Sequence, residues 1–594
     1  MAHTTINPDG SFDFSYGVNS SKVTTIQSEL TPNGLKRSEL AWLQNGTVRG
    51  GGITQRTGWV DRGIFHTGGL YQGGILYEAL DSSVYAVVQI DGEVWRFDVD
   101  NPAGAINLSA VFGLTNNAAS LKAYFCQAEQ FLIIQSGDNV TLPLFWDGTT
   151  LRRSAGLAGV VAEIPEATAM DYYMGRLWYA QGRTYGAGDI VRGPSGTPGL
   201  PYNLTDSVLK VTENPLCLGG DNFTVPTSAG NIRAIKHSAN INTQLGEGSL
   251  YIFTRKQIYS LTVPVTRTDW IGADVNNMPI QTVAQINNGA VSDWSIVAVN
   301  GDLFYTSLDP AYRSLTVAVR NFQQWGNKPI SANVDRALQF NDRSKMFTAS
   351  GMEFSNRLLM TILPGTAPDG INIISQGIAV LDFDPISSLE IATAETQITP
   401  SWEGMWDGLN ILQLLAGDFG GLDRAFATTV SEIDNSLHMW ELTTSERFEN
   451  GDNRVSWYIE SPAYTWGNEL ELKRLVGGEI WIDKVFGTVQ MTFKYRGDAD
   501  PCWHPWFATT ICSEKNCTED VNNPCAYPTT WREGYRFPVT LPEPSSPCDS
   551  MGIRPAQIAH QFQLRIELKG WCRIRGMMLY STPFDKAIYD GLSC

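Results

Sequence analysis

The chain has 594 residues, of which 43% are hydrophobic, 11% aromatic and 18% charged, and its formal net charge is −18 at pH 7. This composition excludes a disordered or coiled-coil protein, and the length suggests about two to four domains. The acidic balance argues against a protein that grips nucleic acid by neutralising phosphates, although ordinary acidic solubility explains the charge equally well.

The 56 glycines and 29 prolines favour strands joined by tight turns, because glycine supplies positive φ and proline blocks helix interiors. We therefore expect a mainly β fold. No stretch approaches the ~18 apolar residues of a transmembrane helix, and the first residues lack a basic start followed by an apolar run. Neither membrane insertion nor secretion is expected.

Residues 1–64 are predicted to form an N-terminal arm and docking segment. They contain the polar, glycine-rich stretch "LAWLQNGTVRGGGITQRTGW", which spans 40–59 and begins in the helical-looking "SELAWLQN". Gly50 to Gly52 would allow an abrupt turn and a close backbone approach, and Arg56 would supply a fork of donors.

Between residues 65 and 455 the strongest signal is a β-hairpin pattern that recurs at uneven intervals. "VYAVVQIDGEVWRFDV" turns at Asp91 and "SIVAVNGDLFYTSL" turns at Asn300, each residue being followed by glycine as type I′ turns prefer. Weaker hairpins are centred on Asp147, Gly175, Lys256, Asn356 and Asn435. The recurrence predicts a β-propeller-like core of six or seven blades with inserted loops, the longest near 183–230. Consecutive β-sandwich hairpins are the alternative.

Residues 456–594 are predicted to form a C-terminal antiparallel β domain. In its last strand Phe562, Leu564, Ile566 and Leu568 alternate with polar residues, which indicates one buried and one polar face. A Cys-, Pro- and Trp-rich excursion near 497–550 interrupts this domain. Its aromatic residues suit either a binding rim or a local core: Trp503, Trp506, Tyr527 and Trp531.

The excursion offers soft metal ligands but not the spacing of a structural zinc site. Its candidate ligands are Cys502, His504, Cys512, Cys517 and Cys525. Short Cys-x-x-Cys knuckles are missing, so at least one disulfide is favoured over zinc, and free core thiols remain a third possibility. No His-Glu-x-x-His, Gly-x-Ser-x-Gly or phosphate-loop motif occurs, so we expect neither a cofactor nor an enzyme.

The stretch 40–59 resembles the start of tail nozzle proteins of short-tailed bacteriophages, also called tail tubular protein B or the tail hub. The family's "W-x-x-N" element, glycine-rich turn and "x-R-x-G" element match Trp42, Asn45, Gly50 to Gly52, Arg56 and Gly58. Looser agreement includes "MGRLWYAQ", "YIFTRKQIYSL" and "GDLFYTSLDPAYRSL", so that the resemblance covers about two-thirds of the chain. The Cys-rich excursion falls outside it.

The resemblance implies a structural virion protein, assembled in the cytoplasm of the host bacterium as a homohexameric ring. Such a ring would dock on the tail adaptor and portal, hold fibres or spikes, and form the distal channel through which double-stranded DNA leaves. An acidic lumen would repel the phosphate backbone, so that DNA passes without specific binding.

On this view, five residues would form an assembly clasp to a neighbouring subunit or to the adaptor: Trp42, Asn45, Arg56, Gly58 and Trp59. The alternative is an ordinary entry strand with a solvated Arg56. Two other functions stay open, namely a tail spike or lectin that binds or degrades polysaccharide, and a fibre-attachment collar.

Overall fold

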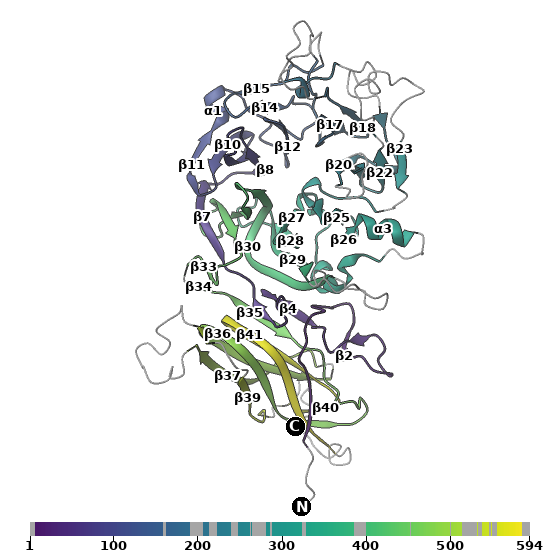
Figure 1. The fold of residues 1–594 in the computed structure, drawn as a ribbon, viewed down its shortest axis with the longest axis vertical. Coiled ribbons are helices and arrows are strands. Elements are labelled where there is room, and N and C mark those ends of the chain that lie inside the picture. The colour runs from purple at the N-terminus through teal and green to yellow at the C-terminus, as the bar shows by residue number, and fades with distance from the viewer. Residues whose placement is uncertain are drawn as a thin grey trace, which may run out of the picture.

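The computed structural model describes residues 6–157, 162–190, 206–212, 223–238, 248–261, 263, 281–284, 288–322, 328–384, 400–451, 453–498, 500–513, 531–532, 537–545, 548 and 555–584. Small sheets lie at one end of the molecule and a sheet with very long strands at the other (Figure 1). The mainly β fold predicted from the sequence is therefore confirmed. None of the helices in these ranges is long and apolar enough to cross a membrane.

Five small antiparallel sheets follow one another in chain order and are arranged as the blades of a propeller. The first two sheets are β8 (Tyr71–Glu78), β9 (Val84–Ile90), β10 (Glu93–Asp98) and β11 (Asn101–Asn107), then β12 (Tyr124–Ala128), β13 (Phe131–Gln135), β14 (Leu144–Trp146) and β15 (Leu151–Arg153). The other three are β16 (Ala169–Tyr173), β17 (Arg176–Gln181), β18 (Thr184–Ala187) and β19 (Phe223–Thr224), then β20 (Ile232–His237), β21 (Leu250–Thr254), β22 (Ile258–Leu261) and β23 (Gln281–Ala284), then β24 (Val297–Val299), β25 (Asp302–Ser307) and β26 (Ala311–Ser314).

All seven predicted hairpins are present. Asp91 and Asn300 have φ of 48° and 49°, and each precedes a glycine that also has positive φ, as the type I′ turn requires. The blades pack face to face through apolar cores: Val87 and Leu132, for example, share the core between the first two sheets. These five sheets therefore do not form the β-sandwich that was the alternative to a propeller.

A second, large sheet contains 16 strands within the described ranges. Its main path runs through β27 (Gly351–Phe354), β28 (Arg357–Thr366), β29 (Ile373–Asp382), β30 (Ser401–Asp418), β4 (Trp42–Gln44), β35 (Ser456–Glu460), β41 (Phe562–Pro583), β36 (Lys473–Gly497) and β37 (His504–Cys512). Its remaining strands are β1 (Asn7–Ser11), β7 (Trp59–His66), β31 (Asp423–Val430), β32 (Leu437–Leu442), β38 (Trp531–Arg532), β39 (Phe537–Leu541) and β40 (Ile558–Ala559).

The prediction of six or seven blades is wrong, because the described residues form five. The hairpins at Asn356 and Asn435 belong to the large sheet instead. This part of the large sheet packs against the first blade, where Val88 shares a core with Phe426, and against the fifth, where Phe304 shares a core with Leu358. It therefore lies between the last blade and the first.

Short elements complete the fold. The two-stranded pairs are β2 (Val23–Ile26) with β3 (Gly34–Leu35), β5 (Gly46–Thr47) with β6 (Thr54–Gln55), and β33 (Phe448–Glu449) with β34 (Asn453–Arg454). The helices are α1 (Leu108–Phe112), α3 (Leu315–Phe322) and α4 (Asp335–Leu338), and the 3-10 turns are η1 (Ser207–Leu209), η2 (Thr227–Ala229), η3 (Asp293–Ser295), η4 (Ile330–Val334) and η5 (Met346–Thr348).

The parts expected as separate units share one sheet. Residues of the expected N-terminal arm supply β1, β4 and β7, so this segment is built into the large sheet. The C-terminal region begins at Ser456 with β35, which pairs with β4 and β41. In β41 the predicted alternation holds for the apolar face, since Phe562, Leu564 and Ile566 are fully buried. The excursion near 497–550 contributes β37, β38 and β39, all paired with β36. The insert near 183–230 contributes β18 and β19 to the third blade, and its residues 191–205 and 213–222 lie outside the described ranges.

Candidate functional site at the N-terminal junction

The candidate site is the segment 42–59, which crosses between the bladed part and the long-stranded part of the molecule. It begins with β4, whose Gln44 pairs in parallel with Met405 of β30 and antiparallel with Tyr458 of β35. The helical character expected for "SELAWLQN" is therefore wrong for Trp42–Gln44. The two free edges of β30 and β35 bind this backbone, and such tertiary pairing overrides weak local propensity.

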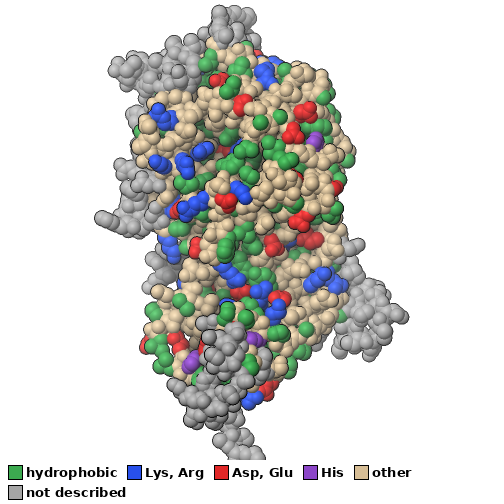
Figure 2. Space-filling view, turned by 180° about the vertical axis from the view of Figure 1, so that it is seen from behind, with side chains coloured by type: hydrophobic (Ala, Val, Ile, Leu, Met, Phe, Trp, Pro, Cys, Tyr) green, Lys and Arg blue, Asp and Glu red, His purple; other side chains and the backbone are tan. Residues whose placement is uncertain are grey.

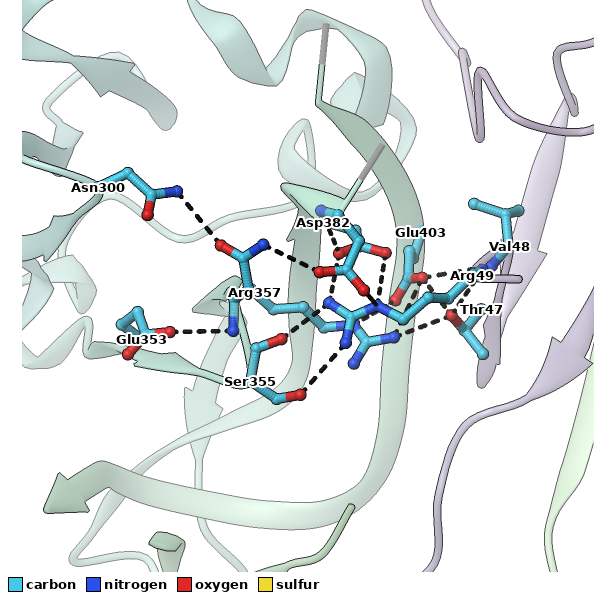
Figure 3. Close-up of polar contacts among 11 residues, drawn as sticks. Thr47, Val48, Arg49, Asn300, Glu353, Ser355, Arg357, Asp382 and Glu403 are labelled. Carbon is cyan, nitrogen blue, oxygen red and sulfur yellow. Dashed lines mark hydrogen bonds and ion pairs between the residues drawn. The ribbon is translucent and has the colours of Figure 1, made fainter. Parts of the chain in front are cut away.

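The first polar cluster is built around two buried carboxylates, Asp382 at the end of β29 and Glu403 in β30 (Figure 3). Arg49 donates from Nε to Asp382 Oδ2 at 3.0 Å, and its Nη2 also bonds the same carboxylate. Arg357 donates from Nε to Glu403 Oε2 at 3.0 Å and from Nη2 to Thr47 Oγ1 at 3.0 Å. Residues from the N-terminal segment and from β28 to β30 thus share one network.

Burial sets the electrostatics of this cluster. It raises the pKa of Glu403, since the charged carboxylate loses water, while the charge of Arg357 opposes that rise. Burial also disfavours the charged form of Arg49, but the hydrogen bond and charge of Asp382 outweigh it, so the pKa of Arg49 lies above its usual value. Each buried carboxylate therefore has its own guanidinium, and removal of either arginine would leave a buried charge uncompensated.

The second polar cluster surrounds Arg56, whose side chain is 2% exposed. Its Nε donates to Asn45 Oδ1 at 3.0 Å, its Nη atoms donate to the carbonyl oxygens of Thr57 at 2.9 Å and Asp407 at 3.1 Å, and Nη2 bonds Glu449. The guanidinium also stacks on the ring of Trp59, 3.5 Å from its centroid. Burial lowers the pKa of Arg56, which the charge of Glu449 offsets in part.

The predicted clasp residues are therefore gathered inside one chain. Arg56 contacts both Asn45 and Trp59. Trp42 joins them through Gln44, which accepts from the indole Nε1 at 3.0 Å and bonds Asp407. The alternative of a solvated Arg56 is wrong, because its side chain is buried and its N–H groups bond acceptors of the same chain. A contact from this segment to a neighbouring subunit or adaptor stays a prediction.

Gly50 and Gly51 form the turn expected of them, and Gly58 lies in a close backbone approach. Gly50 and Gly51 have φ of 79° and 73°, and their carbonyl oxygens accept hydrogen bonds from Arg575 of β41. Gly58 lies against the backbone of Phe448, where an added Cβ would stand 1.9 Å from the Phe448 carbonyl oxygen. A larger residue at position 58 would therefore push two backbone segments apart.

The soft ligands of the excursion, whose spacing disfavoured zinc, do not form a zinc site among the residues that the structure describes. Cys512 is disulfide-bonded and so is Cys548, which confirms the expectation of at least one bridge. A sulfur in a disulfide has no thiolate to offer a metal. His504 pairs through Nε2 with Asp500 at 2.8 Å, Cys502 is a free exposed thiol, and Cys517 and Cys525 lie outside the described ranges. No group of three or more metal-ligating side chains occurs in those ranges.

The aromatic residues of the excursion divide between the two interpretations. Trp506 packs against the core and donates from Nε1 to the Pro542 carbonyl at 2.7 Å, as expected of a local core. Trp503 instead lies under Arg496 at the surface of the sheet. Tyr527 lies outside the described ranges, and only the backbone of Trp531 is described.

Sequence reasoning missed the acidic half of the site. Asp382, Glu403, Asp407 and Glu449 stand far from 42–59 along the chain, and none belongs to a motif. A cavity of about 310 Å³ adjoins both clusters and is lined by Arg49, among other residues. The clusters contain ion pairs and hydrogen bonds but no activated nucleophile, so the arrangement is suited to holding segments together.

Comparison with known proteins gives no family. No protein-family description and no curated protein matches the sequence. Among solved structures, BBS1N in complex with ARL6DN is similar at a TM-score of 0.34 and 10% identity, over 66% of this chain and 99% of that one. A glycoside hydrolase is similar at a TM-score of 0.22 and 10% identity, over 88% and 99%. Similarities this low do not indicate a function.

Proposed function

We propose that this protein is a structural virion protein, the tail nozzle of a short-tailed bacteriophage. It would form the distal DNA-ejection channel as a homohexameric ring, dock on the adaptor and portal, and hold fibres or spikes. The observation that carries the proposal is the position of the segment 42–59, because the residues of the family resemblance are the ones that tie the bladed part to the long-stranded sheet.

Two further features are consistent with a load-transmitting tail component. The strands β36 and β41 have 25 and 22 residues and are paired along most of their lengths, so they form a long continuous ribbon. The net charge of −18 suits the wall of a channel through which DNA slides, because acidic side chains repel the phosphate backbone. On the face shown in Figure 2, Lys and Arg side chains lie among Asp and Glu side chains, so the acidic excess is not gathered there into one area.

The proposal is tested by immunogold labelling of phage particles that carry this chain. An antibody against the protein is expected to label the distal end of the tail tube, and particles without DNA should be labelled at the same place. Label on the fibres alone, or on the capsid, would contradict the assignment as a nozzle.

A second candidate function, polysaccharide binding, is favoured by one cleft. This cleft of about 590 Å³ lies over β30 to β32 and is lined by Asp61, Asp407, Glu432 and the half-buried Trp440. Each carboxylate already has a partner, since Asp61 pairs with His438, Asp407 holds the Gln44 and Asn45 amides, and Glu432 accepts from Asn410. This candidate therefore ranks second. Degradation or tight binding of capsular polysaccharide by the purified protein would put it first.

A further inference from the structure

One face of the large sheet carries a row of charged and aromatic side chains across four strands. In the register of the sheet Trp42 of β4 stands opposite Glu460 of β35, Glu460 opposite Arg565 of β41, and Arg565 opposite Lys494 of β36. Residues directly opposite one another share a face, so these four side chains lie side by side. The other face of β35 points into the core through Ile459.

Two arginines share the one buried carboxylate of this row. Arg336, from α4, donates from Nη1 to Glu460 Oε2 at 2.6 Å and from Nη2 to Oε1 at 3.3 Å. Arg565 donates from Nη1 to Glu460 Oε1 at 3.3 Å. Arg336 also lies over the Trp42 ring, 5.1 Å from its centroid. The exposed fraction of Glu460 is 1%, so a single carboxylate balances two guanidinium groups in a region shielded from water.

A third arginine, Arg496 of β36, adjoins this pair. Its guanidinium lies 4.4 Å from the centroid of the Trp503 ring, and that of Arg565 lies 5.9 Å from the same centroid. Arg496 donates from Nε to Gln563 Oε1 at 2.8 Å. Its two terminal nitrogens have no hydrogen-bond acceptor among the described residues. Stacking on an aromatic face leaves the edge of a guanidinium, with its N–H donors, open to a ligand.

The cluster has more positive than negative charge. Its cations are Arg336, Arg496, Arg565 and Lys494. Glu460 pairs with Arg336 and Arg565, and Glu567 pairs with Lys494 at 2.8 Å and with Arg565 at 3.0 Å. With Asp500, whose charge also acts on Arg496, four cations meet three carboxylates, which leaves one positive charge in excess in a chain whose overall charge is −18. The nearby Asp500 is engaged by His504.

Burial lowers the pKa of the Arg496 guanidinium. The charges of Glu460 and Asp500 raise this pKa by more than the charges of Arg336 and Arg565 lower it. A bound anion would use the unpartnered donors of Arg496 and stabilise its charge further. A cleft of about 430 Å³ adjoins Arg565 and is lined also by Tyr458 and Lys569, but not by Arg336 or Arg496.

We propose that Arg336, Arg496 and Arg565 form a binding site for a phosphate oxyanion. Guanidinium groups from three elements approach one place, which suits a tetrahedral anion with several acceptor oxygens better than a planar carboxylate that fits one fork. The phosphate can come from solution or from the backbone of a nucleic acid. The site does not depend on the function proposed above.

The test is isothermal titration calorimetry of the full chain with inorganic phosphate at low salt. The native protein is expected to bind phosphate, and Arg496→Gln to weaken binding about tenfold or more, because charge-assisted hydrogen bonds are lost. The matched control is Arg96→Gln. Arg96 also stacks on an aromatic ring, Tyr85, at 4.5 Å, but has no ion pair among the described residues, so its loss should leave phosphate affinity unchanged.

Arg336→Gln is a second variant, because 43% of the Arg336 side chain is exposed and its replacement should not prevent folding. Far-ultraviolet circular dichroism checks that both variants are folded. Absence of phosphate binding by the native protein, or equal binding by the native protein and folded Arg496→Gln, would overturn the proposal. A short DNA duplex that competes with phosphate for the native protein assigns the site to a nucleic-acid backbone, and a duplex that does not compete assigns it to free phosphate.

Discussion

Arg56→Met is the sharpest perturbation of the junction. The substitution keeps much of the apolar volume beside Trp59 but removes the donors to Asn45, Asp407 and Glu449. Breaking a buried ion pair costs about 3–5 kcal/mol, and the 23% exposure of the Glu449 side chain places this case near the lower end, at about 3 kcal/mol.

The assay is urea unfolding followed by tryptophan fluorescence, with hydrogen exchange to locate the change. Arg56→Met should lower the midpoint by an amount equivalent to about 3 kcal/mol, and exchange in β4 and β35 should speed up before exchange in the blades. The control is Arg62→Met, whose side chain is 33% exposed and pairs with Glu441, so its loss should cost no more than about 1 kcal/mol. Equal costs for the two variants, or unchanged exchange in β4, would refute the role given to Arg56.

Three further predictions follow from individual contacts. Gly58→Ala should destabilise the chain by about 2 kcal/mol or more in the same unfolding assay, because its Cβ would strike the Phe448 carbonyl, whereas Gly365→Ala, whose Cβ meets only Gln376 Nε2 at 3.9 Å, should be tolerated. Hydrogen bonding to Asp61 raises the pKa of His438 above 6.5, so the stabilisation of the fold by the charged His438–Asp61 pair is complete below pH 6.5 and is lost as pH rises through the raised pKa. His438→Asn should therefore lower the melting temperature more at about pH 5.5 than at about pH 8.5. An equal loss at both pH values would contradict this. Among the described free cysteines, Cys502 should react first with iodoacetamide under native conditions, as measured by mass spectrometry, because it is exposed. Cys126 is half-buried and Cys572 is buried, and burial raises the pKa of the Cys126 thiol to about 12. Labelling of Cys572 at the same rate as Cys502 would contradict this order and show that its strand opens.

Local features of the fold were predictable because they depend on neighbouring residues. Asp91 and Asn300 specify their turns through a preference for positive φ, and alternation along β41 specifies its buried face. The number of blades was not predictable, since hairpin chemistry at Asn356 and Asn435 is the same whether a hairpin closes a blade or joins a larger sheet.

The junction was predictable in part. Gly50, Gly51 and Arg56 could be singled out because a glycine cluster permits an abrupt turn and arginine supplies a fork of donors. Their partners could not, because Arg56 meets Glu449 across 393 residues of chain and no spacing rule reaches that far. For the same reason the insertion of β4 between β30 and β35 overrode the helical pattern of "SELAWLQN".

The central claim, that this protein forms a nozzle ring, is tested most directly by its mass in solution. Sedimentation equilibrium of the purified 65.5 kDa chain, alone and with the tail adaptor, is expected to give a species of about six copies, or a monomer that becomes one on the adaptor. A stable trimer, or a monomer that stays monomeric with the adaptor and degrades polysaccharide, would contradict the nozzle and favour a tail spike.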